Sequence, residues 1–185
     1  MFGDAWPEFP PEDFELIGQP LDFLGVNYYT RSVTCYDPAA WPLKASRVRQ
    51  SEQAYTALDW EVYPEGLTDA LRWVKQHYGD IPLYVTENGA AFDDPPPADG
   101  ALLDDPPRVA YYRTHLRAVQ HALAQGIDLR GYFAWSLLDN FEWAAGHTFR
   151  FGLVHVDFAT QRRTLKASAR FYADVARTNG SALGT

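Results

Sequence analysis

The sequence PLYVTENG at residues 82–89 places an apolar run directly before a Glu-Asn-Gly turn signal. Two similar runs lie before and after it, LDFLGVNYY at residues 21–29 and LRGYFAWSL at residues 129–137. Short, nearly continuous apolar runs are typical of strands in parallel sheets, because helices cover both faces of such sheets. We therefore predict strands at residues 21–29, 82–86 and 129–137.

Helical patterns separate these runs. Pro64 can open a first helix, whose apolar residues recur at spacings of three and four until Gly79 ends it. A second helix is predicted from Asp105, a candidate N-cap, to Gly126, and a third over residues 164–177. The apolar stripe predicted for the second helix consists of Val109, Tyr112, Leu116, Val119 and Leu123. Strand and helix alternate three times, which predicts an α/β fold with right-handed crossovers.

Two long stretches interrupt this alternation. The polar stretch up to about residue 59 has no usable period, and residues 92–107 form an acidic, proline-rich loop that we expect to be exposed and mobile. A chain of 185 residues predicts one domain, spanning residues 1–185 without a second one.

Charge and composition exclude several classes of partner. The chain has 16 Lys and Arg against 24 Asp and Glu, without a basic cluster, so neither a nucleic acid nor an anionic membrane surface is an expected partner. No apolar run reaches the length of a membrane span, and the first residues lack the pattern of a signal peptide. The single Cys35 is predicted to be a buried thiol, and this cysteine usage favours a reducing, cytoplasmic location.

Polar and aromatic residues follow all three predicted strands. In parallel α/β folds the reacting groups gather at the carboxyl ends of the strands. The residues in question are Asn27 and Tyr29 after the first strand, Glu87 after the second, and Trp135, Glu142 and Trp143 after the third. Indole rings stack on the apolar face of a sugar, and carboxylates accept strong hydrogen bonds from its hydroxyls, so this set favours a neutral polyhydroxylated ligand.

Each of these residues also has a simpler interpretation. Asn88-Gly89 can be the turn of a β-hairpin, which would place Glu87 in a solvated turn. Trp135 and Trp143 can be core residues, and Glu142 an ordinary surface carboxylate. The five histidines have no metal-binding spacing, and we expect neither a metal nor a cofactor.

Four motifs resemble glycoside hydrolase family one, the retaining β-glucosidases and their relatives. They are DFLGVNYYT at residues 22–30, VTENG at 85–89, WSLLDNFEWAAG at 135–146 and RFGLVHVDF at 150–158, and the resemblance runs from about residue 20 to residue 180. It implies a TIM (β/α)8 barrel of which this chain supplies only the last three βα units, strands six to eight, and therefore the carboxyl-terminal portion of the family's single barrel domain.

The resemblance also implies roles for the catalytic residues. Glu87 matches the nucleophile that forms a covalent glycosyl-enzyme, and Tyr29 matches the phenol that hydrogen-bonds it. Asn27 would belong to the polar network of the sugar site.

Four further residues match the sugar-binding positions of the family. Trp135 matches a stacking platform, Glu142 a carboxylate that binds two sugar hydroxyls, Trp143 a hydrogen-bond donor, and Phe151 an aromatic lining residue. His147 departs from the family, in which a tyrosine is usual at this position. The expected substrate is a β-glucoside or a related small oligosaccharide.

The acid/base of the retaining mechanism is missing. The family carries it in an Asn-Glu-Pro motif on the fourth strand, and no Asn-Glu-Pro occurs in these 185 residues. Nothing in the sequence argues for a raised pKa of Glu142 that would make it a substitute. We therefore expect the chain to be inactive alone. Either it is a truncated or split gene product, or a separate amino-terminal half completes the barrel. The alternatives are a non-catalytic carbohydrate-binding remnant and a 6-phospho-β-glycosidase.

Overall fold

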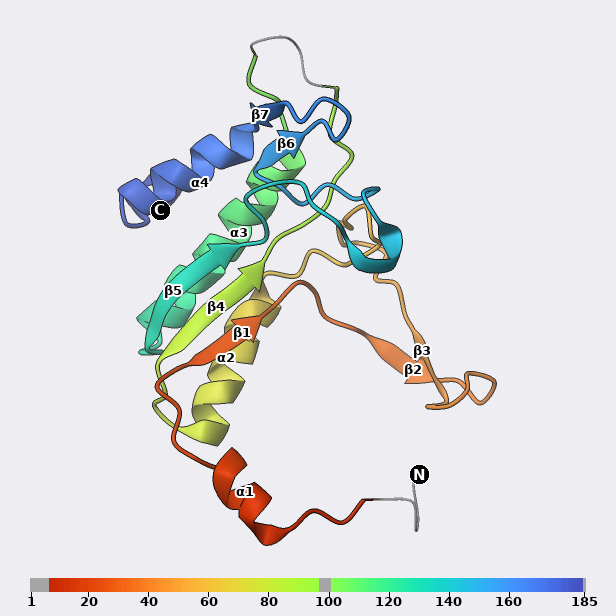
Figure 1. Ribbon diagram of the computed structural model, residues 1–185, viewed down its shortest axis with the longest axis vertical. Coiled ribbons are helices and arrows are strands. Elements are labelled where there is room, and N and C mark those ends of the chain that lie inside the picture. Colours follow the sequence, from red (N-terminus) through yellow and green to blue (C-terminus); the bar gives the residue numbers. More distant parts are fainter. Residues whose placement is uncertain (1–6, 97–100, 185) are drawn as a thin grey trace.

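The computed structural model of the chain describes residues 7–96 and 101–184. Its centre is a parallel sheet of the strands β1 (Leu24–Asn27), β4 (Leu83–Asn88) and β5 (Leu129–Ala134), in the spatial order β1-β4-β5 (Figure 1). The three predicted parallel strands are confirmed. β1 and β5 are shorter than the apolar runs that predicted them, and β4 extends two residues further than predicted.

The predicted helices are present, with changes at their ends. α2 (Glu65–Tyr78) lies between β1 and β4, α3 (Pro106–Ala124) between β4 and β5, and α4 (Ala167–Arg177) follows β5. Gly79 ends α2 with a φ of 81°, as its position predicted. The predicted start of the third helix at residue 164 is wrong, because that residue lies in β7 (Arg163–Leu165), which pairs antiparallel with β6 (Val154–Val156).

The helices pack against one face of the sheet only. Leu67 and Leu71 of α2 belong to the same hydrophobic cluster as Val85 on the central strand, and all three are fully buried. The other face is open, since the side chains of Phe23 and Phe133 are 54% and 57% exposed. Parallel sheets are usually covered on both faces, but three strands of an eight-stranded barrel are expected to leave their inner face open, as the described residues do. Within them, β1 and β5 are edge strands with free backbone groups.

The buried face of α3 differs from the predicted stripe. Leu123 is 47% exposed, whereas the helix buries several polar residues that an apolar pattern could not indicate. The buried residues of α3 are Arg108, Tyr111, Tyr112, His115, Leu116, Ala118 and Ala122. Asp105 precedes the helix without capping it, because its carboxylate accepts hydrogen bonds from Arg108 and Ser168 instead.

A β-hairpin lies in the polar stretch before residue 59, in which no hydrophobic periodicity indicated a strand. β2 (Thr34–Tyr36) and β3 (Ala45–Arg47) pair antiparallel and extend away from the sheet (Figure 1). Cys35 lies on β2 and is exposed, so the prediction of a buried thiol is wrong. An isolated two-stranded ribbon has no second layer that could cover its residues. The cytoplasmic location inferred from cysteine usage stays a prediction.

The acidic loop before α3 is less exposed than expected. The side chain of Asp94 is 3% exposed, and Leu103 and Asp105 are buried, while residues 97–100 lie outside the described part of the chain. At the other end, α1 (Pro11–Ile17) buries none of its residues. In the described residues, no helix meets both the length and the apolarity that a membrane span requires.

Candidate active site

Glu87 lies near the carboxyl end of the central strand. Tyr29, just after the neighbouring strand β1, donates a hydrogen bond of 2.6 Å from its Oη to Oε2 of Glu87. The hairpin interpretation of Asn88-Gly89 is wrong, because β4 continues through Asn88 and is parallel to both of its neighbours. Gly89 is required there for another reason, since a Cβ would lie 1.8 Å from the carbonyl oxygen of Trp135.

All seven residues proposed for the site line one cavity of about 390 Å³ at these strand ends. An eighth residue, Trp60, lines it as well and was missed by the sequence analysis. The lining residues are Asn27, Tyr29, Trp60, Glu87, Trp135, Glu142, Trp143 and Phe151.

Three aromatic rings form one wall of the cavity. The ring centroids of Tyr29, Trp60 and Phe151 lie 5.3 to 6.2 Å apart in pairs. Hydrogen bonds fix the segment with Trp60 against the residues that follow β1. Arg31 donates from Nε and Nη2 to the carboxylate of Glu61, which is only 2% exposed. Such a paired bond fixes direction as well as distance, so the wall has a defined position beside Tyr29.

The loop after β5 presents the second carboxylate. The backbone N–H of Glu142 donates to the carbonyl of Gly146 at 2.6 Å, closing a tight loop around a short 3₁₀ helix, Trp143–Ala145. Asn140 donates to the hydroxyl of Ser136 at 2.7 Å and so fastens the start of the loop. Trp143 is 82% exposed, which leaves its ring free for a ligand.

The electrostatics of the cavity suit a neutral ligand. Partial burial raises the pKa of Glu142, and the negative charge of Glu87 raises it further. No sequence pattern around Glu142 indicated this upward shift of its pKa. Burial, together with the hydrogen bond to Glu87, also raises the pKa of Tyr29, so the phenol stays protonated as a donor. Two acidic groups and a phenol thus face a space where hydroxyl groups can be bound.

A network of charged residues, most of them buried, supports the loop that carries Glu142. Asp139, which is 4% exposed, accepts hydrogen bonds from Lys166, from Arg150 and from the backbone N–H groups of Gly152 and Val156. The network continues from Lys166 to Asp94, then to Arg108 and Asp105. Its three carboxylates match its three cations, as buried charges require. It therefore fixes the chain on both sides of Phe151.

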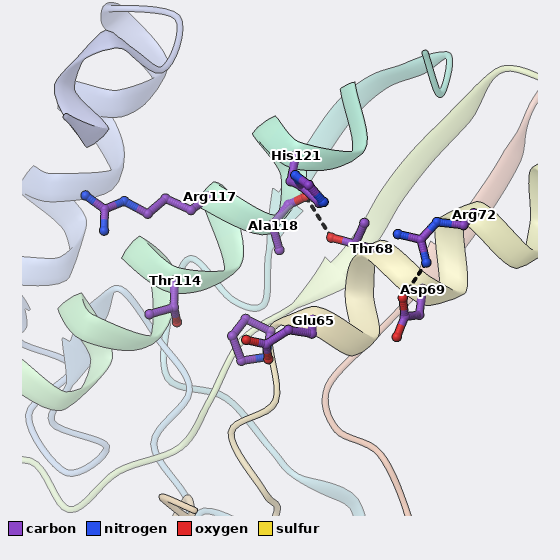
Figure 2. A pocket seen from close by; sticks show the side chains of 9 residues that line it. Glu65, Thr68, Asp69, Arg72, Thr114, Arg117, Ala118 and His121 are labelled. Carbon is purple, nitrogen blue, oxygen red and sulfur yellow. Dashed lines mark hydrogen bonds and ion pairs between the residues drawn. The ribbon is translucent and has the colours of Figure 1, made fainter. Parts of the chain in front are cut away.

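A second cavity, of about 420 Å³, lies between α2 and α3 and away from the strand ends (Figure 2). Its charged residues are already partly engaged, since Arg72 pairs with Asp69 and Arg117 donates to the carbonyl of Leu183. It contains neither Glu87 nor a tryptophan, so we place the chemistry at the strand ends. In the described residues, no group of three or more His, Cys, Asp or Glu is arranged to hold a metal ion.

Comparison with known proteins identifies one family. The model of glycosyl hydrolase family 1 matches residues 3–181. Beta-glucosidase A of Thermotoga maritima is 44% identical over 174 residues, covering 94% of this chain and 38% of that relative. A beta-glucosidase of an Agrobacterium species is 41% identical over 182 residues, again covering 94% of this chain and 38% of the relative.

Solved structures give the same result. A family 1 β-glucosidase from Thermotoga maritima superposes with a TM-score of 0.88 at 43% identity, over 96% of this chain and 39% of that protein. The β-glucosidase of the same organism in complex with deoxynojirimycin gives 0.87 at 42% identity over the same shares. The chain thus spans less than two fifths of the length of these relatives, whose fold is the TIM barrel.

Proposed function

The chain belongs to glycosyl hydrolase family 1, and we propose that it forms part of a retaining β-glycosidase of the β-glucosidase type. The family indicated by the sequence motifs is confirmed, as is the match to only part of each relative. We propose further that β1, β4 and β5 are strands six, seven and eight of the barrel. Three adjacent parallel strands, each followed by a helix or a loop with site residues, support this placement.

The contact between Tyr29 and Glu87 carries the proposal. Glu87 attacks the anomeric carbon of a β-glucoside and forms a covalent ester while the bond to the leaving group breaks. Tyr29, whose Oη lies 2.6 Å from Oε2 of Glu87, fixes the direction of the attacking carboxylate. Water then attacks the same carbon and releases Glu87, so the product keeps the configuration of the substrate.

The remaining cavity residues bind the sugar. Trp135 offers an indole face to the ring, and the carboxylate of Glu142 accepts hydrogen bonds from two hydroxyls. Trp143 donates from its indole N–H, while Asn27 joins the polar side of the site. Asn27 is held for this by Thr86, whose hydroxyl donates to its side-chain oxygen at 2.6 Å.

The proton donor must come from outside these 185 residues. The mechanism needs a second carboxylate, about 5 to 5.5 Å from the nucleophile, that protonates the leaving group and later activates water. We assign Glu142 to sugar binding, so the remaining barrel units have to supply this group. We call the chain together with those units, in one polypeptide or two, the completed barrel.

The alternative of a 6-phospho-β-glycosidase lacks support. The eight residues that line the cavity include two carboxylates but neither Lys nor Arg, and a phosphate dianion would be repelled there. The alternative of a non-catalytic remnant keeps the same sugar contacts and differs only in lacking turnover.

Covalent labelling tests the function directly. A 2-deoxy-2-fluoro-β-glucoside with an activated leaving group should react with the completed barrel, because the departure of such a leaving group needs little acid assistance. The fluorine slows hydrolysis of the resulting ester, so the labelled enzyme accumulates. Peptide mass analysis should place one fluoroglucosyl group on Glu87. Labelling on another residue, or none at all in a barrel that binds glucoside inhibitors, would contradict the assignment and favour the remnant.

Substitution of Glu142 tests the sugar-binding role. In the completed barrel, Glu142→Gln should lower kcat/KM for a β-glucoside by more than about tenfold, because a charge-assisted contact that strengthens toward the transition state is lost. It should also shift the ratio of kcat/KM toward a 6-phosphorylated glucoside, since the repulsive charge is gone. Glu65→Gln, at an exposed carboxylate on α2, is the control and should change neither value. An unchanged ratio in Glu142→Gln would place this residue elsewhere.

A further inference from the structure

Asn88, the residue after Glu87, has a buried side chain with a complete set of partners. Its exposure is 0%, and it does not line the cavity. Its Nδ2 donates to the carbonyl of Tyr28 at 2.7 Å and to the hydroxyl of Tyr111 at 3.0 Å, while its Oδ1 accepts from the hydroxyl of Tyr132 at 2.5 Å. A buried amide bonded in this way specifies one arrangement of its neighbours.

This amide spans a place where the sheet is irregular. The register of β1 against β4 shifts between Val26 and Asn27, so that Asn27 pairs with Glu87. The register of β4 against β5 shifts between Val85 and Asn88. The ladder is irregular here, although the backbone N–H of Tyr28 still donates to the carbonyl of Glu87 at 2.9 Å and that of Trp135 to the carbonyl of Asn88 at 2.8 Å. The side chain of Asn88 links both neighbouring strands at this level, through a carbonyl next to β1 and a hydroxyl on β5.

Tyr111 extends the link to the residue that touches the nucleophile. Its hydroxyl accepts from Asn88 and donates to the carbonyl of Tyr29 at 3.3 Å. Its ring is held in place as well, because it stacks on His115 with a centroid distance of 3.8 Å. Burial lowers the pKa of His115 to about 4, so this support is uncharged at neutral pH.

We propose that Asn88 is a positioning residue, which acts with Tyr111 and Tyr132 to hold the phenol of Tyr29 against the carboxylate of Glu87. This inference rests on the proposed function, because it concerns the group that attacks the sugar. The 2.6 Å contact needs the two backbones to keep their relative position to within tenths of an ångström. A displacement of about 1 Å can reduce catalysis by about 10²-fold, so the support of the pair controls its reactivity.

The test removes one hydroxyl from the network. Tyr111→Phe keeps the packed ring and loses the bonds to Asn88 and Tyr29. The measurement is the first-order rate of labelling of Glu87 in the completed barrel by the activated 2-fluoroglucoside, with the dissociation constant of the reagent taken from the same concentration series. We expect the rate to fall by about tenfold with little change in the dissociation constant.

The matched control is Tyr172→Phe. This hydroxyl bonds the carbonyl of Tyr132 at 3.0 Å, so it supports the same strand without touching Asn88. It should reduce the melting temperature by a similar amount and leave the labelling rate unchanged. If both variants slow labelling equally, or if Tyr111→Phe labels like the wild type, the positioning role is refuted.

A double-mutant cycle separates positioning from general stability. Tyr29→Phe removes the contact with Glu87, so Tyr111→Phe should have no further effect on the labelling rate in that background. If Tyr111→Phe slowed labelling by the same factor in the wild type and in Tyr29→Phe, the inference would be overturned, while Glu87 would remain the nucleophile. A wild-type barrel that is not labelled on Glu87 would instead overturn the proposed function, and this inference with it.

Discussion

Replacement of Glu87 by alanine should abolish hydrolysis of a β-glucoside by the completed barrel, and azide or formate should restore part of it. The loss should be roughly 10⁴-fold or more, because removal of the proposed nucleophile eliminates the covalent route and not only a binding contact. The restored reaction should give a product of inverted configuration. A small anion enters the space that the carboxylate leaves and attacks once, whereas the native reaction uses two successive displacements.

The structure explains why a small anion can reach the carbon. Glu87 is partly exposed at the wall of a 390 Å³ cavity, and Tyr29 stays behind as a hydrogen-bond donor for the anion. The control is Glu142→Ala, which should lose activity without any rescue, since the proposed role of Glu142 is to bind hydroxyls and not to attack. Product anomers are identified by NMR spectroscopy. Near wild-type activity of Glu87→Ala would remove the basis for its assignment as nucleophile.

The parallel sheet and the main site could be predicted because their signals are local. Apolar runs marked the three strands, and the residues at their ends met in one cavity because parallel strands align their carboxyl ends. Trp60 could not be found in this way. It lies at the end of a long polar stretch, after the β2–β3 hairpin, which extends away from the sheet before the chain returns to the cavity.

The buried polar groups were also beyond sequence patterns. Arg108 and Lys166 have fully buried side chains, although such residues are usually exposed unless they are paired. Lys166 pairs with Asp94 and Asp139, which are 72 and 27 residues away from it, so no local spacing relates the three. The prediction that Cys35 is buried failed for a different reason. It used the average behaviour of cysteine, while the hairpin that carries it packs against no second layer.

The open face of the sheet leads to a prediction about the 185-residue chain on its own. β1 and β5 are edge strands in the described part of the chain, and Phe23 and Phe133 are more than half exposed on the uncovered face. α1 adds Phe14 and Ile17, which are 62% and 77% exposed. Exposed strand edges and apolar surface of this kind favour aggregation. The purified chain should therefore fold poorly and scatter light at concentrations where the completed barrel stays monodisperse.

The same isolated chain should show no measurable hydrolysis of an aryl β-glucoside. A positioned proton donor contributes roughly 10²- to 10⁴-fold to the rate, and the proposed mechanism places this donor outside these residues. Addition of the remaining barrel units should restore both solubility and turnover, and Glu87→Gln should abolish the restored activity. Turnover by the chain alone that disappears in Glu87→Gln would show that these residues supply their own acid. A completed barrel that binds glucosides and never cleaves them would instead identify a carbohydrate-binding remnant, because the nucleophile and the sugar contacts would be present without a competent second carboxylate.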